Sequence, residues 1–124
     1  MNPLRIGTLG AARITPAALI RPARKVPDVE VVAVAARDRG RAEKFAHKHG
    51  IAKVHDTYED VLADPEIDAI YNPLPNGLHG RYTIAALAAG KPVLCEKPLT
   101  ANAEEAERVA KAATEHDLVV MEAF

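Results

Sequence analysis

The residues of this 124-residue chain that could do chemistry follow directly on short apolar segments. The first such place is a turn of small residues, Gly10-Ala11-Ala12, which follows the segment 4–9 and leads into a helical pattern. A strand that enters a helix through a tight turn presents backbone N–H groups and a positive helix end to a phosphate. Residues 10–14 are therefore predicted to hold a phosphate group.

This turn departs from the fingerprint of dinucleotide-binding proteins, Gly-x-Gly-x-x-Gly/Ala. Gly10 keeps the first position, whereas Ala12 and Thr15 occupy the other two. The methyl group of Ala12 stands where the backbone should approach a pyrophosphate closely, so the pattern taken alone is weak. A plain strand-to-helix turn that binds nothing is the alternative that these residues leave open.

Three arginines, Arg37, Arg39 and Arg41, follow the second apolar segment, 29–36. They lie at the start of a predicted helix, where the helix dipole disfavours each cation by roughly a few tenths of a kcal/mol. An anion among them would explain this placement, and the strand ends without the acidic residue that binds a ribose 2′-hydroxyl. The arrangement favours a 2′-phosphate. A solvated helix start, balanced by nearby carboxylates, is the alternative.

The remaining reactive side chains are not spaced as a nucleophilic catalytic site or a metal site would require. The chain contains no serine, which excludes every serine nucleophile, and its single cysteine, Cys95, lies in a buried type of strand where a packing role is expected. His47 and His49 are two residues apart on a predicted helix, so they point in different directions and do not suit a metal pair. We expect no metal site.

Strand-like and helix-like segments alternate along the whole chain. Strands are predicted at 4–9, 29–36, 53–55, 67–72, 92–96 and 118–121. Residues suited to cap helices follow four of the strands: Asp38, Thr57, Asn76 and Asn102. Asn76 should cap a helix over 77–89, and Pro22 should bend or end the first helix. This alternation predicts an α/β fold, a doubly wound parallel sheet in three layers, as one domain over residues 1–124.

Ligands of such sheets bind beyond the carboxyl ends of the strands, at the point where the strand order reverses. The segments just after the strands are therefore the candidate site: 10–13, 36–41, 72–76 and 96–98.

Charge and hydropathy exclude several partners. The net charge of −1 provides no overall positive field for nucleic acid or an anionic membrane. No apolar run approaches the roughly 20 residues of a membrane helix, and the N-terminus lacks the pattern of a secretory signal. A cytoplasmic location is expected.

Two blocks carry a resemblance to a known family: Ile-Tyr-Asn-Pro-Leu-Pro-Asn-Gly-Leu-His at 70–79 and Gly-Lys-Pro-Val-Leu-Cys-Glu-Lys-Pro-Leu at 90–99. With Met-Glu-Ala-Phe at 121–124, they resemble the glucose-fructose oxidoreductase / inositol dehydrogenase (Gfo/Idh/MocA) family. Within it, the sequence is most similar to the NADP-dependent dihydrodiol and xylose dehydrogenase branch. The resemblance covers essentially the whole chain, and it implies a Rossmann fold.

The resemblance also implies roles for particular residues. Lys97 matches the catalytic lysine that reaches the substrate hydroxyl beside the nicotinamide, and Arg37 matches the 2′-phosphate contact of members that use NADP. The remaining cofactor-binding residues belong to the phosphate turn and to the nicotinamide side: Gly10, Ala11, Ala12, Arg13, Ile14, Asn72, Leu74, Pro75, Asn76, His79, Glu96, Lys97 and Pro98. NADP is expected in preference to NAD.

The family continues into a second, mostly antiparallel domain with an Asp-x-x-x-His type motif, which supplies further catalytic groups and commonly the oligomer interface. The resemblance thus implies the N-terminal portion of an NADP-dependent oxidoreductase of a sugar, polyol or diol, whose full-length form is a homo-oligomer. A complete nucleotide-binding module without catalysis is the alternative. The block Glu96-Lys97-Pro98 would then have no evident purpose.

Overall fold

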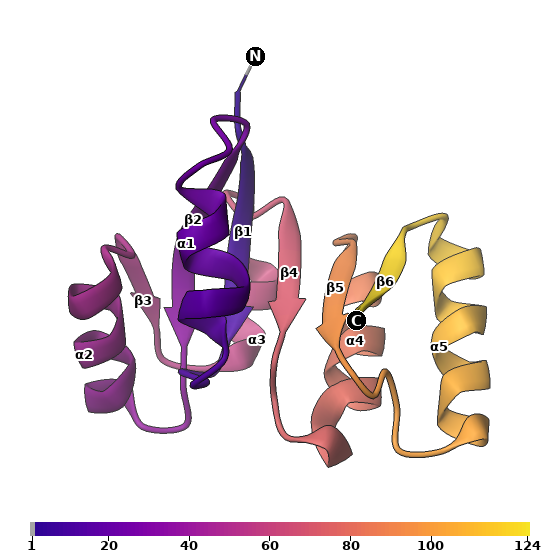
Figure 1. Ribbon diagram of the computed structural model, residues 1–124. Coiled ribbons are helices and arrows are strands. Elements are labelled where there is room, and N and C mark those ends of the chain that lie inside the picture. Colours follow the sequence, from indigo (N-terminus) through magenta and orange to yellow (C-terminus); the bar gives the residue numbers. More distant parts are fainter. Residues whose placement is uncertain (1) are drawn as a thin grey trace.

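Six parallel strands form one sheet in the computed structural model, which describes residues 2–124 (Figure 1). Their order across the sheet is β3-β2-β1-β4-β5-β6. The strands are β1 (Leu4–Leu9), β2 (Val29–Ala35), β3 (Lys53–His55), β4 (Ala69–Asn72), β5 (Val93–Glu96) and β6 (Val120–Ala123). The predicted doubly wound parallel sheet is confirmed, although β4 and β6 each begin two residues later than expected.

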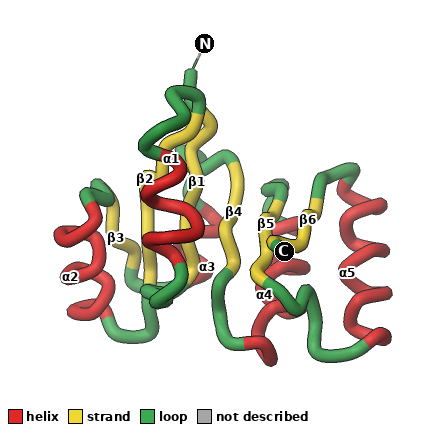
Figure 2. Tube along the Cα trace, viewed as in Figure 1, coloured by secondary structure: helices red, strands yellow, loops and turns green. Residues whose placement is uncertain are grey.

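Helices cover both faces of this sheet (Figure 2). They are η1 (Pro16–Ile20), α1 (Arg21–Ala23), α2 (Arg39–His49), α3 (Tyr58–Ala63), η2 (Asn76–Leu78), α4 (His79–Ala88) and α5 (Ala103–His116). The elements η1, α1 and α2 lie on one face, and α3, α4 and α5 lie on the other. None of the helices within residues 2–124 has both the length and the apolar character needed to cross a membrane.

Three helices begin with the side-chain caps that were predicted. The capping oxygens of Asp38, Thr57 and Asn102 accept hydrogen bonds from the backbone N–H three residues ahead, at 3.3, 3.1 and 2.8 Å. Each cap satisfies one of the donors that a helix start leaves without an intrahelical partner. Gly50 ends α2 in the left-handed conformation, with φ of 70°, as expected for a glycine after a helix.

The prediction that Asn76 caps a helix over 77–89 is wrong. Asn76 opens the 3₁₀ turn η2, and α4 begins only at His79, with no side-chain cap at either start. Backbone carbonyls take the donors instead, because Leu78 N–H bonds to the Pro75 carbonyl at 2.8 Å and His79 N–H bonds to that of Asn76. A 3₁₀ turn at a helix start thus replaces the side-chain cap.

Pro22 changes the form of the first helix as well as ending it. Proline has no N–H, and its ring clashes with the carbonyl four residues earlier. Residues 16–20 accordingly wind as a wider π-helix, in which Arg21 N–H bonds to the Pro16 carbonyl. The helix then ends at Ala23, close to the predicted break.

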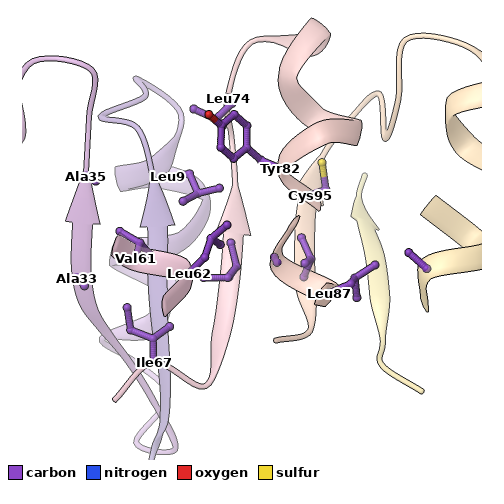
Figure 3. Close-up of a cluster of buried hydrophobic side chains, with 14 residues drawn as sticks. Leu9, Ala33, Ala35, Val61, Leu62, Ile67, Leu74, Tyr82, Leu87 and Cys95 are labelled. Atoms are coloured by element: carbon purple, nitrogen blue, oxygen red, sulfur yellow. The ribbon is translucent and has the colours of Figure 1, made fainter. Parts of the chain in front are cut away.

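Two apolar clusters hold the layers together. The smaller one packs Ile20 of η1 and Ala46 of α2 against Val34 of β2. The larger one joins the strands to α3, α4 and α5 (Figure 3), and its buried members are Leu9, Ala33, Ala35, Val61, Leu62, Ile67, Ile70, Leu74, Tyr82, Ala86, Leu87, Val93, Cys95 and Ala112. Leu74 lies in the loop after β4, so this core reaches the candidate site.

The helices do not cover the sheet equally on its two faces. On the side of η1 and α1, no helix of residues 2–124 lies over β5 and β6 (Figure 1). An apolar hollow of about 260 Å³ is found there, with walls that include Ile6, Leu19, Leu94 and Met121. Met121 is 60% exposed. This part of the sheet therefore presents apolar side chains at its surface.

A buried carboxylate ties β3 to the turn after α3. Asp64 is 7% exposed, and its Oδ2 accepts hydrogen bonds from Lys53 Nζ at 3.0 Å and from His55 Nε2 at 2.8 Å. Its Oδ1 accepts from Glu66 N–H at 2.8 Å, and Lys91 Nζ donates to its carbonyl at 3.0 Å. Burial by itself raises the pKa of Asp64, but the hydrogen bonds outweigh this effect and hold the pKa well below the ordinary aspartate value.

We predict that Asp64→Asn lowers the free energy of unfolding by about 1–3 kcal/mol at pH 7, because two donors lose a charged acceptor. Because the pKa of Asp64 is lower in the folded protein than its ordinary value of 3.8, the ionised carboxylate stabilises the fold at pH values above 3.8. This stabilisation is lost as the pH falls from 3.8 to the pKa of the folded state. Urea unfolding of both proteins should therefore show a difference that shrinks below about pH 4. A difference that stays constant down to pH 3 would contradict this account.

Candidate functional site

The site residues predicted from sequence gather along the carboxyl edge of the sheet. β1 and β4 pair directly, with Gly7 opposite Ile70, and the strand order reverses between them. Two cavities lie along this edge. The loop after β4 separates them, because Pro73 and Leu74 line both cavities. The site is therefore at the switch point where ligands of doubly wound sheets bind.

The first cavity, of about 380 Å³, lies between the turn after β1 and the start of α2. Gly10 in its wall has φ of 78°, the left-handed conformation that favours glycine. A Cβ atom at this position would also lie 3.1 Å from Leu74 Cδ2. The glycine kept from the dinucleotide fingerprint is thus required by the backbone and by the neighbouring loop.

The same turn leaves backbone donors for a ligand. Gly10 N–H bonds to the Ala35 carbonyl at 2.6 Å, and Thr15 N–H bonds to the Ala12 carbonyl at 3.3 Å. Within residues 2–124, the N–H groups of residues 11–14 have no hydrogen bond to the protein. Donors of this kind, at the start of a helix, suit a phosphate. Ala12, which stands at the second glycine position of the fingerprint, forms part of the cavity wall.

Arg39, the middle one of the three arginines, is occupied elsewhere. Its Nε donates to Glu43 Oε1 at 3.0 Å, and its Nη1 donates to Asp56 Oδ1 at 2.6 Å. For this residue the alternative interpretation, a helix start balanced by carboxylates, is correct. The prediction of three arginines around one anion is reduced to two.

Those two, Arg37 and Arg41, both line the first cavity. Neither forms an ion pair with a carboxylate in the part of the chain that the structure describes. Arg41 Nη2 donates to the Ala11 carbonyl at 3.2 Å and so connects α2 to the phosphate turn. Tyr58 lines the same cavity. Arg41 and Tyr58 are absent from the set of cofactor-binding residues predicted from sequence, although the arginine cluster had included Arg41.

The second cavity, of about 230 Å³, contains Lys97 together with Ile14, Asn76, His79 and Glu96. Lys97 has no hydrogen bond or ion pair to any residue among 2–124, so its ammonium group is available to a ligand.

Glu96, beside Lys97, is fixed by a buried tyrosine. Its Oε2 accepts a hydrogen bond from the Tyr71 hydroxyl at 2.5 Å. Burial raises the pKa of Tyr71, and the hydrogen bond to Glu96 raises it further. The tyrosine therefore remains a donor at physiological pH, and it holds the carboxylate in one position next to Lys97.

Asn72 lies beneath the loop rather than in a cavity wall. It is completely buried, and its Oδ1 accepts from Leu74 N–H at 3.2 Å. Its Nδ2 donates to the His79 carbonyl and to Thr83 Oγ1, each at 3.2 Å. Asn72 thus holds the loop that contains Pro73 and Leu74, the residues that form a wall shared by the two cavities. Two other predicted residues, Arg13 and Pro98, line neither cavity.

Cys95 is completely buried at the end of β5. Burial raises the pKa of its thiol to about 11, which favours a packing role over a nucleophilic one. Within residues 2–124, no group of three or more side chains suited to a metal ion is found.

The domain thus has a parallel sheet whose switch point carries a tight strand-to-helix turn, two arginines without an ion pair among residues 2–124, and a cavity that contains a lysine. These are the features of a nucleotide-binding α/β domain. Residues 4–124 match the oxidoreductase family described as having an NAD-binding Rossmann fold. The chain belongs to this family, Gfo/Idh/MocA.

The chain is also similar to proteins that are named as dehydrogenases. The chain is 43% identical over 121 residues to D-xylose 1-dehydrogenase (NADP(+)) 2 of Haloferax volcanii. This match covers 98% of this chain and 37% of the relative. It is 46% identical over 95 residues to trans-1,2-dihydrobenzene-1,2-diol dehydrogenase of Oryctolagus cuniculus, covering 77% of this chain and 29% of the relative.

A solved structure of the 3-ketoreductase KijD10 from Actinomadura kijaniata, in complex with NADP and TDP-benzene, matches with a TM-score of 0.91 and 39% identity. The match covers 98% of this chain and 37% of that one. The chain therefore spans well under half the length of these relatives.

We predict that Asn72→Ala destabilises the domain, because it leaves Leu74 N–H buried without a partner and removes the donor to the His79 carbonyl and to Thr83 Oγ1. A buried group left without a partner costs roughly 1–3 kcal/mol. Asn76→Ala is the matched control, since the Asn76 side chain has no hydrogen bond to residues 2–124, and it should change the stability by less than about 0.5 kcal/mol. Urea unfolding measures both variants. Equal losses would show that the Asn72 amide does not support the loop.

Proposed function

We propose that this chain is the NADP-binding domain of an oxidoreductase that acts on a hydroxyl-bearing carbon of a sugar, polyol or diol. The observation that carries the proposal is the pair of adjacent cavities at the switch point. One combines the turn at residues 10–14 with Arg37 and Arg41, which form no ion pair in the described part of the chain, and the other contains Lys97. A dinucleotide with a 2′-phosphate has the same arrangement, because its 2′-phosphate lies at the adenosine end and its reactive nicotinamide ring lies at the other end.

The first cavity would hold the adenosine half of the cofactor. The N–H groups of residues 11–14 suit the pyrophosphate, while Arg37 and Arg41 suit a 2′-phosphate, to which a guanidinium donates charge-assisted hydrogen bonds. The end of β2 offers Ala36 where a ribose 2′-hydroxyl would require a carboxylate. These residues favour NADP over NAD. NADP is also bound in the KijD10 structure.

The second cavity would hold the reacting groups. When bound, the nicotinamide supplies the hydride chemistry. Oxidation of an alcohol also requires a proton acceptor at the hydroxyl oxygen, and reduction of a ketone requires a donor there. Lys97 can exchange such a proton, and unlike Glu96 and His79, which line the same cavity, its side chain has no hydrogen-bond partner among residues 2–124. Glu96, fixed by Tyr71, forms the adjoining wall.

The substrate itself is inferred from the relatives. They include dehydrogenases named for D-xylose and for a dihydrodiol. Because the matched segment is little more than a third of the xylose dehydrogenase, most substrate contacts should come from polypeptide outside this segment. The alternative, a nucleotide-binding module without catalysis, would share the first cavity but would make no use of Lys97.

Cofactor choice is tested by Arg37→Ala. Loss of a charge-assisted contact to phosphate, about 1.5–3 kcal/mol, should weaken NADPH binding by roughly 10- to 150-fold and leave NADH binding almost unchanged. Arg39→Ala is the matched control, since Arg39 is bound to Glu43 and Asp56 and should affect neither cofactor. Titration of nicotinamide fluorescence gives both affinities. Equal losses for NADPH and NADH would show that Arg37 does not contact the 2′-phosphate.

The catalytic role is tested by Lys97→Met, in the protein expressed with any coding sequence that follows codon 124. With D-xylose and NADP, kcat/KM should fall by about 100- to 10,000-fold, whereas the Kd of NADPH should stay within about twofold. Lys111→Met, on the exposed surface of α5, should change neither value. Unchanged turnover would remove Lys97 from the mechanism. NADPH binding by a wild-type protein that turns over no sugar, polyol or diol would favour the non-catalytic module.

A further inference from the structure

Tyr58 brings a hydroxyl group to the wall of the first cavity. It is the first residue of α3, and it lines this cavity together with Arg37 and Arg41. Within residues 2–124 its hydroxyl group forms no hydrogen bond, whereas the hydroxyl groups of the other two tyrosines, Tyr71 and Tyr82, each donate to a carboxylate. The Tyr58 hydroxyl is therefore a donor that a ligand in this cavity can use.

Packing on the core side fixes the ring of Tyr58. The ring lies against the larger apolar cluster and meets the ring of Tyr82 edge to face, with the ring centroids 5.2 Å apart and the ring planes at 82°. This is a favoured arrangement of aromatic pairs. Tyr82 is itself buried, and its hydroxyl donates to Glu59 Oε1 at 3.3 Å. The position of the Tyr58 side chain is thus set by the fold before any ligand binds.

Both arginines of the first cavity act on the hydroxyl group of Tyr58. Burial raises the pKa of this hydroxyl and the nearby Tyr82 raises it further, whereas the positive charges of Arg37 and Arg41 lower it. The net effect is a raised pKa, so the hydroxyl keeps its proton and can donate at physiological pH. Two guanidinium groups and one hydroxyl, from the end of β2, from α2 and from α3, therefore lie around one part of the cavity.

This set of donors matches the needs of a phosphate monoester. Such a group has three terminal oxygens and a charge of about −1.5 to −2 at neutral pH. Two guanidinium groups balance that charge, and a neutral hydroxyl adds a third donor without a further positive charge. We propose that Tyr58 is a specificity-determining residue for NADP, whose hydroxyl group donates a hydrogen bond to the 2′-phosphate that Arg37 and Arg41 bind. This inference rests on the proposed function, since it concerns the same cavity and the same cofactor.

The adenine base is the other part of the cofactor that could contact Tyr58. A base would pack against the aromatic ring and would gain nothing from the hydroxyl group. The hydroxyl without a partner in the described part of the chain, beside two arginines that form no ion pair there, favours the phosphate. NADPH and NADH share the adenine and differ only in the 2′-phosphate, so a comparison of the two separates these contacts.

The test is Tyr58→Phe, in the protein expressed with any coding sequence that follows codon 124, because this change keeps the ring and removes the hydroxyl. We expect the Kd of NADPH to rise by about 10-fold or more, the effect of losing a hydrogen bond to a charged group, and the Kd of NADH to stay within about twofold. Tyr82→Phe is the matched control. It removes a hydroxyl that is bound to Glu59 and belongs to neither cavity wall, so both Kd values should stay within about twofold.

Unchanged NADPH binding by Tyr58→Phe would overturn this role of Tyr58. Equal losses for NADPH and NADH would also overturn it, because they would assign the side chain to the adenine or to the shape of the cavity. Failure of the cofactor proposal is recognised separately, since the wild-type protein would then bind NADPH no more tightly than NADH. A preference for NADPH that Arg37→Ala removes and Tyr58→Phe leaves intact would overturn the role of Tyr58 alone.

A second comparison leaves out the nicotinamide and with it the second cavity. Calorimetric titration with adenosine 2′,5′-bisphosphate and with adenosine 5′-monophosphate measures the contribution of the 2′-phosphate directly. Tyr58→Phe should weaken binding of the bisphosphate by the same factor as binding of NADPH, and it should leave the monophosphate within about twofold. Unchanged binding of the bisphosphate would show that the hydroxyl does not contact the 2′-phosphate.

Discussion

The pairing of β1 with β4 is the constraint on which the site depends. These strands are joined by more than fifty residues of chain, yet they lie side by side at the centre of the sheet. Their ends bring the phosphate turn against the loop that contains Leu74. A Cβ atom at position 10 would lie 3.1 Å from Leu74 Cδ2, so the turn and the loop approach this closely because Gly10 has no side chain. Both cavities lie beside this contact, since Leu74 lines each of them.

Local chemistry explains why much of the fold could be predicted from the sequence. Asp38, Thr57 and Asn102 cap their helices through bonds that span three residues, and such spacing is visible in a sequence. The apolar runs of β1 and β2 are equally local signals. Asn76 misled the prediction because a capping side chain and a 3₁₀ turn compete for the same donors, and the sequence does not show which of them prevails.

The candidate site was predictable to the extent that it follows from strand ends. Arg37 and Lys97 each lie just after a strand, and the topology brings them to one edge. The partner of Arg39 at Asp56 is seventeen residues away, in a separate turn, so no spacing rule identifies it. The support that Asn72 gives to the loop after β4 also depends on contacts between elements. Such second-layer roles emerge only when side chains are placed in three dimensions.

The shared wall at Leu74 has a consequence for how this domain can change over evolution or in a directed library. Arg37, Arg41 and Tyr58 belong to the first cavity alone, and Glu96 and Lys97 belong to the second alone. With the roles proposed above for the two cavities, nucleotide preference and reaction chemistry depend on separate sets of residues and can diversify separately. Pro73 and Leu74 line both cavities, so a replacement at either position alters the walls of both. Variation should be tolerated on either side of this loop long before it is tolerated within the loop.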